Sequence, residues 1–512
     1  MNLKDLLVPL LIGTLFAITI RYFFMKDADI SQAERSRVAP AKEEINRPLE
    51  FDVDFVDSDF NKVAKQEDVE TKFAKLTFSE AGATLIKAYF KHDVGNNIQL
   101  LQTITDEGKE NQCFLLALQG STPLLYRLTN RFEDDENIIL QYESTSKDKT
   151  ISKQFKIYKN IPKLDLQINL KTKNEERLRL FFNSPLLDGL KDDKIQGIVN
   201  DGKYLVKRNI DIAKEGRYWD QPTLFGSEDR YFVNVMIADQ NKFTQRAYYK
   251  VDDKGLSLIS ILESAKIASD SSWVMSFYFG PKKAELMQSV DPRLSGTLEF
   301  GMWEIICLPM LKLLNFFHSY AKNYGIAIIL LTILIKLLLF PFTWRGQKNL
   351  NAMSKKQKEF QQKMEYLKQK HKGNTEEFRR EQAELLRTHA LPGIGGCLGL
   401  LLQIPVFFAL QRVLSNAIEL YKAPFLWIPN LSMPDPYYIF PILVGIGMIW
   451  SGFGSSSSLK KIDPKQKLMS YSMALVFTAI TFSLSSGLVL YLVVNTLLMV
   501  IQNFLQNRFI KA

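Results

Sequence analysis

Cysteine and histidine are scarce in this chain, and their scarcity excludes several classes of site. The 512 residues include only 3 Cys and 4 His. Cys113, Cys307 and Cys397 are far apart and odd in number, so they imply no disulfide framework. The histidines lack metal-ligand spacing, and no Gly-rich phosphate loop or nucleophile elbow is present. We therefore predict no metal, no cofactor, no catalytic residue and no enzymatic activity.

Long apolar runs are missing from the middle of the chain. Residues 25–297 are polar and mixed, whereas residues 298–512 alternate apolar blocks with basic loops. A mean hydropathy of −0.08 hides this division. The net charge of +10 is carried largely by those loops. This charge indicates a membrane surface or a nucleic-acid-bearing partner.

The N-terminal region indicates an anchor followed by a linker. Residues 6–24 are an apolar run with Lys4 before it, and no small-residue cleavage site follows. We therefore predict an uncleaved transmembrane anchor over residues 1–24. Residues 25–70 are charged, contain two prolines and show no sustained periodicity, which is typical of a flexible linker.

Residues 71–297 are predicted to form an antiparallel β-sandwich. Apolar and polar residues alternate in LDLQINL (164–170) and SWVMSFYFG (272–280), and YFVNVMIAD (231–239) and KFAKLTF (72–78) are further strand candidates. Short strands separated by Gly, Asn and Asp turns favour a sandwich. The acidic residues of this region are scattered, and we interpret them as solvated strand faces.

Residues 298–323 are predicted to form an amphipathic helix at the membrane interface. Apolar residues recur at three- and four-residue steps, at Trp303, Ile306, Met310, Leu313 and Phe317. The segment is too polar to span a bilayer, and it directly precedes an apolar run. The alternative is a core helix of a soluble domain.

A lysine lies inside the apolar run that follows. From residue 326 to residue 342 the only polar side chains are Thr332 and Lys336, which share a helix face. Seventeen helical residues reach about 26 Å, close to the thickness of a hydrocarbon core. A charge at such a depth indicates a functional site. The alternative is that Lys336 snorkels toward the basic segment beyond Pro341.

Basic loops predict the topology. Lys and Arg outnumber Asp and Glu between Arg345 and Ala390, and the only break in the helical pattern is at 372–374, so we predict a helical hairpin over 346–390. The positive-inside rule places this hairpin in the cytoplasm. Four further apolar segments, 393–414, 439–453, 469–484 and 487–505, bring the total to six spans. Both termini are then cytoplasmic, and residues 25–323 are periplasmic.

Polar side chains recur inside two of these later spans. Gln403 lies in the third span, and Tyr491 and Asn495 lie one turn apart in the last. Such residues often only join helices within a membrane. Together with Lys336 they would instead line a water-accessible concavity in the cytoplasmic half of the membrane.

The chain from about 298 to 505 resembles the YidC-type membrane protein insertases, which include the mitochondrial Oxa and chloroplast Alb insertases. The segments that carry the resemblance are PMLKLLNFFHSY, the Lys336 span ending in FPFT, GGCLGLLLQIPVFFAL, APFLWIPNLSMPDPYYIFPIL and SGLVLYLVVNTLLMVIQ. The resemblance implies a polytopic α-helical membrane protein with a five-helix insertase core over 324–510. Before that core, it implies the all-β periplasmic supersandwich of Gram-negative members.

The resemblance also implies a function and a site. Members insert and help fold new proteins in the bacterial inner membrane, alone or with the Sec translocon. Their groove, open to cytoplasm and lipid, carries a positive residue that is usually arginine and here matches Lys336, and a sensitive threonine that matches Thr332. Tyr491 matches one aromatic of a pair, whereas Leu492 replaces the other. The implied partners are nascent membrane proteins, the Sec translocon, membrane lipids and, weakly through the cytoplasmic loops, the ribosome.

Two alternatives come from other functional classes. A secondary transporter or channel could use Lys336 to bind an anionic solute, although paired internal repeats are not evident. An anchored external enzyme or sugar binder could use the sandwich, where His92 is the only histidine in 71–297.

Overall fold

The structure, a computed structural model, describes most of the chain after its first 63 residues. The described residues are 64–94, 97–104, 113–118, 124–146, 149–187, 195–200, 205–209, 217–251, 257–298, 300–371, 375–388, 398–454 and 464–509. The anchor predicted over residues 1–24 therefore lies outside them. The chain divides into two compact units, a β unit (Phe24–Glu299 with Asn416–Glu419) and a helical unit (Phe300–Ser415 and Leu420–Ala512, with Met1–Phe23).

The described part of the β unit forms three antiparallel sheets. The four-stranded sheet has the order β1 (Gln66–Glu70), β2 (Ala74–Ser79), β3 (Thr84–Val94), β4 (Asn97–Ile104). The five-stranded sheet has the order β13 (Tyr218–Asp220), β16 (Arg246–Val251), β17 (Leu258–Glu263), β10 (Leu178–Asn183), β5 (Leu115–Leu118). The nine-stranded sheet has the order β12 (Leu205–Asn209), β11 (Gln196–Asn200), β14 (Leu224–Glu228), β15 (Phe232–Asp239), β18 (Ser271–Pro281), β9 (Lys163–Thr172), β8 (Lys149–Tyr158), β7 (Asn137–Ser146), β6 (Arg127–Glu133).

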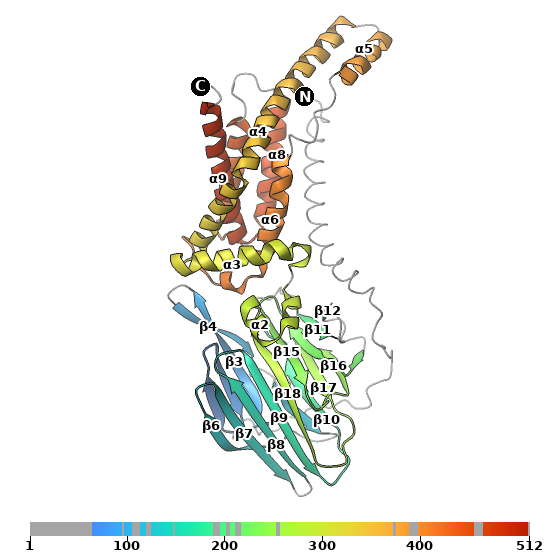
Figure 1. Ribbon diagram of the computed structural model, residues 1–512, viewed down its shortest axis with the longest axis vertical. Coiled ribbons are helices and arrows are strands. Elements are labelled where there is room, and N and C mark those ends of the chain that lie inside the picture. The colour runs from blue at the N-terminus through green and yellow to red at the C-terminus, as the bar shows by residue number, and fades with distance from the viewer. Residues whose placement is uncertain are drawn as a thin grey trace. The chain divides into compact units, whose positions relative to one another are not determined.

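The nine-stranded sheet forms one layer, and the two smaller sheets pack against it (Figure 1). Aromatic rings make the contacts between the layers. Phe78 of β2 meets Phe155 of β8, with ring centroids 4.9 Å apart. Tyr249 of β16 stacks on Phe225 of β14 at 4.4 Å. The core of the sandwich therefore lies between the nine-stranded sheet and its two smaller partners, and the prediction of an all-β domain is confirmed.

The alternating segments form the strands that their pattern predicted. The four segments are β2, β9, β15 and β18. Along β18, Trp273, Met275, Phe277 and Phe279 are all buried, as one face of a strand on a core requires. The same alternation is found in β9, whose inward residues are leucine and isoleucine from Leu164 to Leu170, followed by Thr172.

The end predicted for the linker is wrong. Residues 66–70 form β1, which pairs with β2 in the register Gln66↔Ser79 to Glu70↔Lys75. Its sequence, QEDVE, conceals a strand because only Val69 faces the core. An edge strand can be this polar because most of its side chains remain in solvent.

Two short helices complete the β unit. α2 (Ala284–Val290) and η3 (Pro292–Thr297) follow β18 directly. Their residues Met287 and Leu294 are fully buried in a cluster with residues of the nine-stranded sheet, among them Ile198, Leu224 and Val235. The exit from the sandwich is therefore packed onto the sheet and forms part of the β unit.

The helical unit contains eight described helices. They are η4 (Gly301–Trp303), α3 (Glu304–Ala321), α4 (Tyr324–Lys370), α5 (Thr375–Thr388), α6 (Leu398–Asn416), α7 (Ile439–Gly454), α8 (Pro464–Thr481) and α9 (Ser486–Phe509), and a further 3-10 turn, η6 (Ile418–Leu420), follows α6. Among the described residues, Tyr324–Pro341 and Ser486–Leu505 are long and apolar enough to span a membrane, and Ile439–Trp450 is a shorter apolar helix. The count of six spans stays a prediction.

α3 forms where an amphipathic helix was predicted. Its packed seam consists of Cys307, Met310, Leu311 and Leu314. Met310 is the one buried member of the predicted stripe, and Trp303, Ile306, Leu313 and Phe317 are half-buried. The seam is therefore shifted by about one residue from the prediction. The opposite face exposes Ile305, Phe316 and Tyr320, and its location at a membrane interface stays a prediction.

α4 joins two elements that the sequence pattern separated. We predicted a span and then a hairpin, but a single helix of 47 residues passes through Pro341 and forms the first arm of the hairpin (Figure 1). The basic segment is rich in Lys, Gln, Glu and Met, which are strong helix formers. The predicted break is confirmed, because α4 ends at Lys370 and α5 begins at Thr375. An ion pair of 3.1 Å between Lys370 and Glu381 joins the two arms.

The periodicity of the apolar residues predicts an inner seam of the hairpin at Met353, Phe360, Met364 and Leu367. Leu367 is buried, and Phe360 and Met364 are half-buried, whereas the side chain of Met353 lies outside the described residues.

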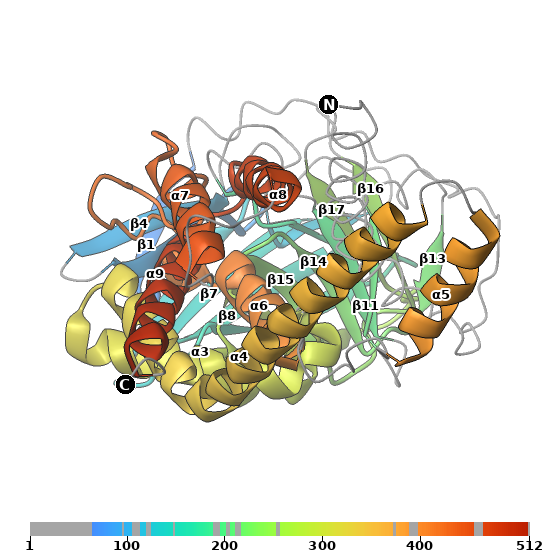
Figure 2. The same cartoon turned by 90° about the horizontal axis from the view of Figure 1, so that it is seen from above.

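Two glycines allow α7 to lie close to its neighbours. α7 packs against both α8 and α9 (Figure 2). A Cβ at Gly445 would come within 2.4 Å of Thr478 Oγ1 on α8, and one at Gly447 within 2.6 Å of Thr496 Cγ2 on α9. Small residues at such contacts let helix backbones approach, which is how helices associate in lipid.

Candidate functional site

The first candidate residues lie one turn apart on α4. Thr332 is 1% exposed, and its Oγ1 donates to Ile328 O of its own helix at 2.6 Å. Lys336 is half-buried and is the only charged residue in Tyr324–Pro341. No hydrogen bond or ion pair joins its Nζ to any residue that the structure describes. An ammonium in an apolar span without a partner is available to a group from outside the chain.

Proline removes one helical hydrogen bond near Lys336 of α4 and one near Gln403 of α6. Pro341 lacks the N–H that would pair with Leu337 O, and Leu337 follows Lys336. Pro405 likewise leaves Leu401 O without its helical donor, near Gln403. These carbonyls add polarity at the levels of the two candidate side chains.

One direct contact joins the candidates on α6 and α9. Gln403 Nε2 donates a hydrogen bond to Tyr491 Oη, across 88 residues of chain. Tyr491 is 1% exposed, whereas Gln403 is half-buried. A buried phenol normally has such a partner, since an unpaired hydroxyl in an apolar interior is costly.

The structure assembles the candidates only in part. α4 packs against α9, which carries Tyr491 and Asn495. Asn495 is half-buried, one turn beyond Tyr491. Among the described residues, no hydrogen bond links Lys336 or Thr332 to Gln403, Tyr491 or Asn495. The five residues thus comprise one bonded pair and three separate polar groups on adjoining helices.

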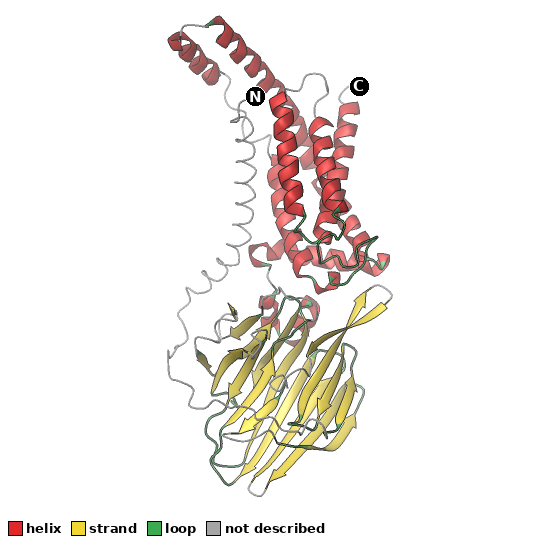
Figure 3. Cartoon of the chain, turned by 180° about the vertical axis from the view of Figure 1, so that it is seen from behind, coloured by secondary structure: helices red, strands yellow, loops and turns green. Residues whose placement is uncertain are grey.

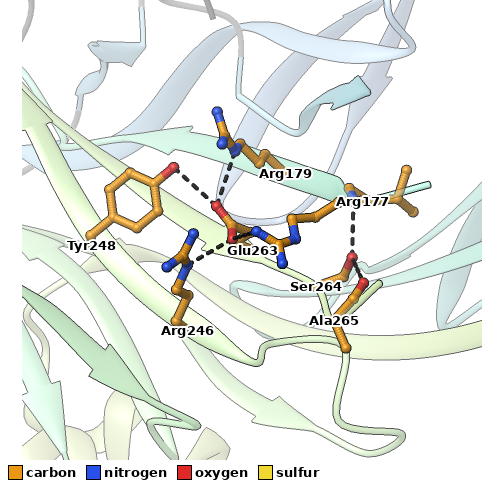
Figure 4. A network of polar contacts seen from close by, with 8 residues as sticks. Arg177, Arg179, Arg246, Tyr248, Glu263, Ser264 and Ala265 are labelled. Atoms are coloured by element: carbon orange, nitrogen blue, oxygen red, sulfur yellow. Dashed lines mark hydrogen bonds and ion pairs between the residues drawn. The ribbon is translucent and has the colours of Figure 1, made fainter. Parts of the chain in front are cut away.

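The β unit contains a buried ionic cluster that was not predicted from the sequence. Glu263 is 1% exposed and meets three guanidinium groups, at Arg246 (2.7 Å), Arg179 (3.0 Å) and Arg177 (3.3 Å), while Tyr248 Oη lies 3.5 Å away (Figure 4). Arg179, Glu263 and Arg246 are direct cross-strand neighbours on β10, β17 and β16. The prediction that the acidic residues of the β unit lie on solvent-exposed strand faces is wrong for Glu263.

Two further charged groups, Glu228 and Lys153, are buried in the sandwich and have polar partners. Glu228 is 2% exposed and pairs with Lys207 at 2.6 Å and Lys282 at 2.8 Å, so the solvated interpretation is wrong here too. Lys153 is 0% exposed and donates to the carbonyl oxygens of Gly82, Ala83 and Phe114 at 2.5, 3.2 and 2.7 Å. Burial lowers the pKa of Lys153 well below its ordinary value. A lysine at an inward position of an alternating strand was the available signal.

None of these groups forms a metal centre. Among the described residues, no cluster of three or more His, Cys, Asp or Glu side chains could hold an ion. Cys113 is buried, and burial raises the pKa of its thiol to about 12, so it is not a reactive nucleophile. The features that could bind a polar group are thus Lys336 of α4, which has no partner among the described residues, and the bonded pair of Gln403 and Tyr491 on α6 and α9.

Both units match known protein families. Residues 66–313 match the family model described as YidC periplasmic domain, and residues 316–512 match that described as 60Kd inner membrane protein. Membrane protein insertase YidC of Geotalea uraniireducens is 32% identical over 464 residues, which are 86% of this chain and 86% of that protein. The Geobacter sulfurreducens protein of the same name is 36% identical over 305 residues, 59% of this chain and 56% of its own.

Among solved structures, a crystal structure described as an active YidC insertase with its first transmembrane domain resolved covers 95% of this chain and 99% of its own. The identity is 17% and the TM-score 0.38, a likeness too low to support an argument.

Proposed function

Because this chain belongs to the YidC family of membrane protein insertases, we propose that it inserts newly made proteins into the inner membrane along a polar path. Five residues of three helices line this path: Thr332 and Lys336 of α4, Gln403 of α6, and Tyr491 and Asn495 of α9. The family assignment brings with it a periplasmic all-β domain and nascent membrane proteins as substrates. The path and its residues are the proposal.

The physical problem is to carry a polar segment across about 30 Å of hydrocarbon, where unpaired polar groups are costly. Hydroxyl, amide and ammonium groups partway across shorten the distance that the segment travels without partners. Nothing in this step requires a bond to be made or broken, so a set of fixed polar groups suffices.

The observation that carries the proposal is Lys336, a half-buried cation without a described partner inside a span. A charge held at this depth attracts an acidic side chain of the segment being translocated. The attraction is transient, because the segment leaves once it reaches water outside. Lys336 therefore acts as a fixed charge on the path.

The substrate's own apolar helix supplies the driving force. Transfer of about 20 apolar residues from water into lipid is strongly favourable. α9 offers an exposed apolar face along which such a helix would slide, at Leu497, Ile501 and Phe504. On α6, Ile404 is similarly exposed.

The topology completes the proposal. Six spans are proposed, with residues 6–24 as the first, both termini and the hairpin over 346–390 in the cytoplasm, and residues 25–323 in the periplasm. The basic hairpin supports this orientation through the positive-inside rule. Assistance by the Sec translocon, and a weak contact of the cytoplasmic loops with the ribosome, belong to the same proposal.

Site-specific photo-crosslinking tests the path. A probe at Leu497 of α9 or Ile404 of α6 should crosslink to a stalled nascent span, whereas a probe at Ile446 of α7, which is 53% exposed, should not. The α7 probe is the matched control, since it is also an exposed isoleucine on an apolar helix. Equal crosslinking at all three positions, or none at Leu497 and Ile404, would reject the proposed path.

A further inference from the structure

The ionic cluster around Glu263 carries an excess of positive charge. It lies in the β unit, whose strands are yellow in Figure 3. Glu263 Oε1 accepts a hydrogen bond from Arg246 Nε and is paired with Arg177 Nη1, while Oε2 accepts from Arg179 Nε (Figure 4). A single guanidinium group neutralises a carboxylate. The other two therefore leave two positive charges without a counter-charge in the cluster.

The three guanidinium groups differ in exposure. The side chain of Arg179 is 8% exposed, whereas those of Arg177 and Arg246 are 25% and 23% exposed. Arg179 and Glu263 thus form the buried base of the cluster, and the other two arginines extend from that base to the solvent. A solute can reach these outer two arginines without unfolding the sheet.

Arg246 has hydrogen-bond donors that the protein does not use. A guanidinium group donates from its Nε and from both Nη atoms. Arg246 uses Nε for Glu263, and neither Nη has an acceptor among the residues that the structure describes. Its cross-strand neighbour on β13, Asp220, is exposed and forms no ion pair with it in that part of the chain. An excess of positive charge remains even when Asp220 is counted.

Arg177 also lacks acceptors. Its Nε is buried and has no hydrogen-bond partner among the described residues, and its Nη1 lies 3.3 Å from Glu263. The carboxylates of the two preceding residues are paired with lysines instead. A buried N–H without an acceptor costs free energy, so the surroundings of Arg177 are incomplete without a further acceptor.

The outer guanidinium groups are held in position before any ligand binds. Glu263 fixes Arg246 through Nε, and the guanidinium carbon of Arg246 lies 5.7 Å from the centre of the Tyr218 ring. Glu263 is itself held by Arg179 and by Tyr248 Oη, at 3.0 and 3.5 Å. Side chains that are ordered in advance lose little freedom on binding. Glu263 is therefore a positioning residue for the outer arginines.

We infer that Arg177 and Arg246, positioned by Glu263, bind a phosphate group on the β unit. A phosphate group supplies several acceptor oxygens and, as a monoester, a charge of about −1.5 to −2 near neutral pH. These match the unused donors and the excess charge of the cluster, and arginine binds phosphate through pairs of N–H groups. The group belongs to a soluble phosphate ester or to a lipid headgroup. The site is separate from the proposed path, because its residues lie in the β unit.

Calorimetric titration of the full chain in dodecyl maltoside micelles tests the site. Inorganic phosphate is the probe, and chloride keeps the ionic strength constant. Arg246→Gln and Arg177→Gln should each weaken phosphate binding by at least about tenfold, because each removes charge-assisted hydrogen bonds to the anion. Absence of phosphate binding to the wild-type protein, or equal affinity in the wild-type protein and both variants, would overturn the inference.

Arg131→Gln is the matched control for the titration. Arg131 of β6 is also a partly exposed arginine of the β unit, and it is paired with two glutamates. Its ion pairs leave no excess of positive charge, so its replacement should change the phosphate affinity by less than about twofold. A loss as large as that of Arg246→Gln would show general attraction of the anion to a basic surface and would overturn the site.

Stability measurements separate binding from a purely structural role of the cluster. A ligand that binds only the folded state raises the stability of that state. Phosphate should therefore raise the denaturant midpoint of the β unit in the wild-type protein and in Arg131→Gln, and leave it unchanged in Arg246→Gln. A purely structural cluster would make Arg246→Gln less stable by the same amount with and without phosphate, and that result would overturn the inference.

Two phosphate esters identify the source of the group in the same titration. Binding of glycerol 1-phosphate that is lost in Arg246→Gln would assign a soluble phosphate ester. Binding of dihexanoylphosphatidylglycerol that is lost in the same variant would assign a lipid headgroup. If neither ester bound in a manner that depends on Arg246, the assignment to a phosphate ester would be overturned.

Discussion

The charge of Lys336 costs free energy inside an apolar span, so a lysine is not expected there for packing alone. Its ammonium is half-buried in an apolar span and has no partner among the described residues. Insertion scales put the cost of such a charge at roughly 2.5–3.5 kcal/mol. Thr332, one turn away, donates its hydroxyl hydrogen bond to Ile328 O of its own helix. Its oxygen can still accept a hydrogen bond. This part of the site was predicted from the sequence, because charge and period are visible there.

Lys336→Glu should impair insertion of single-spanning substrates with acidic external tails by at least about tenfold, since attraction becomes repulsion. Lys336→Arg should be tolerated, because the charge is kept even though its shape differs. Insertion is measured by protease protection of the tail at matched expression. Lys312→Glu, the same change on an exposed residue of α3, is the control. Full insertion by Lys336→Glu would remove the electrostatic role.

Lys153 should be the most sensitive single position of the sandwich. Lys153→Met leaves three buried carbonyl oxygens without their donor, and we expect a loss of about 1–3 kcal/mol in the free energy of unfolding. Denaturant unfolding of the β unit in the full chain measures it. Lys156→Met, on the other face of β8, should cost less than about 1 kcal/mol. Equal losses would contradict the role of the buried ammonium.

The burial of Tyr248 should make the free energy of unfolding of the β unit depend on pH in the alkaline range. Burial raises its pKa to about 12, whereas an unfolded phenol ionises near 10. Between these values the unfolded state releases its proton first, so Tyr248 contributes stability that is fully present below pH 10 and lost as pH rises to about 12. In Tyr248→Phe, the fall in unfolding free energy from pH 9 to pH 12 should be smaller by up to about 2.7 kcal/mol. Alkaline unfolding followed by tryptophan fluorescence measures this, and identical pH profiles would contradict it.

At the scale of elements, α4 is the feature that the sequence pattern divided incorrectly. A helix of 47 residues is about 70 Å long, more than twice the thickness of a hydrocarbon core. Apolar periodicity ends near Pro341, so the pattern indicated a boundary there. The backbone continues because a proline removes only one hydrogen bond and the residues beyond it favour helix.

The continuity of α4 makes the direction of the hairpin depend on the span that carries Lys336. Ala352→Pro breaks the helix between them at a cost of about 3 kcal/mol. We expect insertion to fall severalfold, with the membrane spans still folded, as protease mapping would show. Ala352→Leu keeps the helix and should insert normally. Normal insertion by Ala352→Pro would mean that a loosely tethered hairpin suffices.

At the scale of the whole molecule, the β unit and the helical unit have separate cores. Met287 and Leu294 belong to the core of the sandwich although they follow its last strand. A deletion that ends at residue 290 would therefore strip Leu294 of its partners and expose it. Removal of residues 66–298 leaves no part of that cluster behind.

The chain without residues 66–298 should keep much of its insertion activity, because the proposed path lies in the helical unit. Membrane insertion of a single-spanning substrate measures this, and the full chain at equal abundance is the control. Complete loss in a protein that still reaches the membrane would favour the reading in which the external domain is an enzyme or a sugar binder.

From the sequence we could predict the family, the β and helical character of the two halves, and a lysine inside an apolar span. Each of these depends on local period, charge or length, which neighbouring residues display directly. We made no prediction for Lys153, although Ile151 and Phe155 alternate with it along β8 and were an available signal of an inward position. The sequence could not reveal the carbonyl groups that Lys153 meets.

Contacts between side chains that are far apart in the chain could be identified only in the tertiary structure. The pairing of Gln403 with Tyr491, the three arginines around Glu263 and the bonds from Ser486 to Met433 join residues many positions apart. Contacts of this kind depend on register and packing, which bring strands and helix ends together in space. The position of Lys336 was therefore visible in the sequence, whereas the pairing of Gln403 with Tyr491 emerged only from the folded chain.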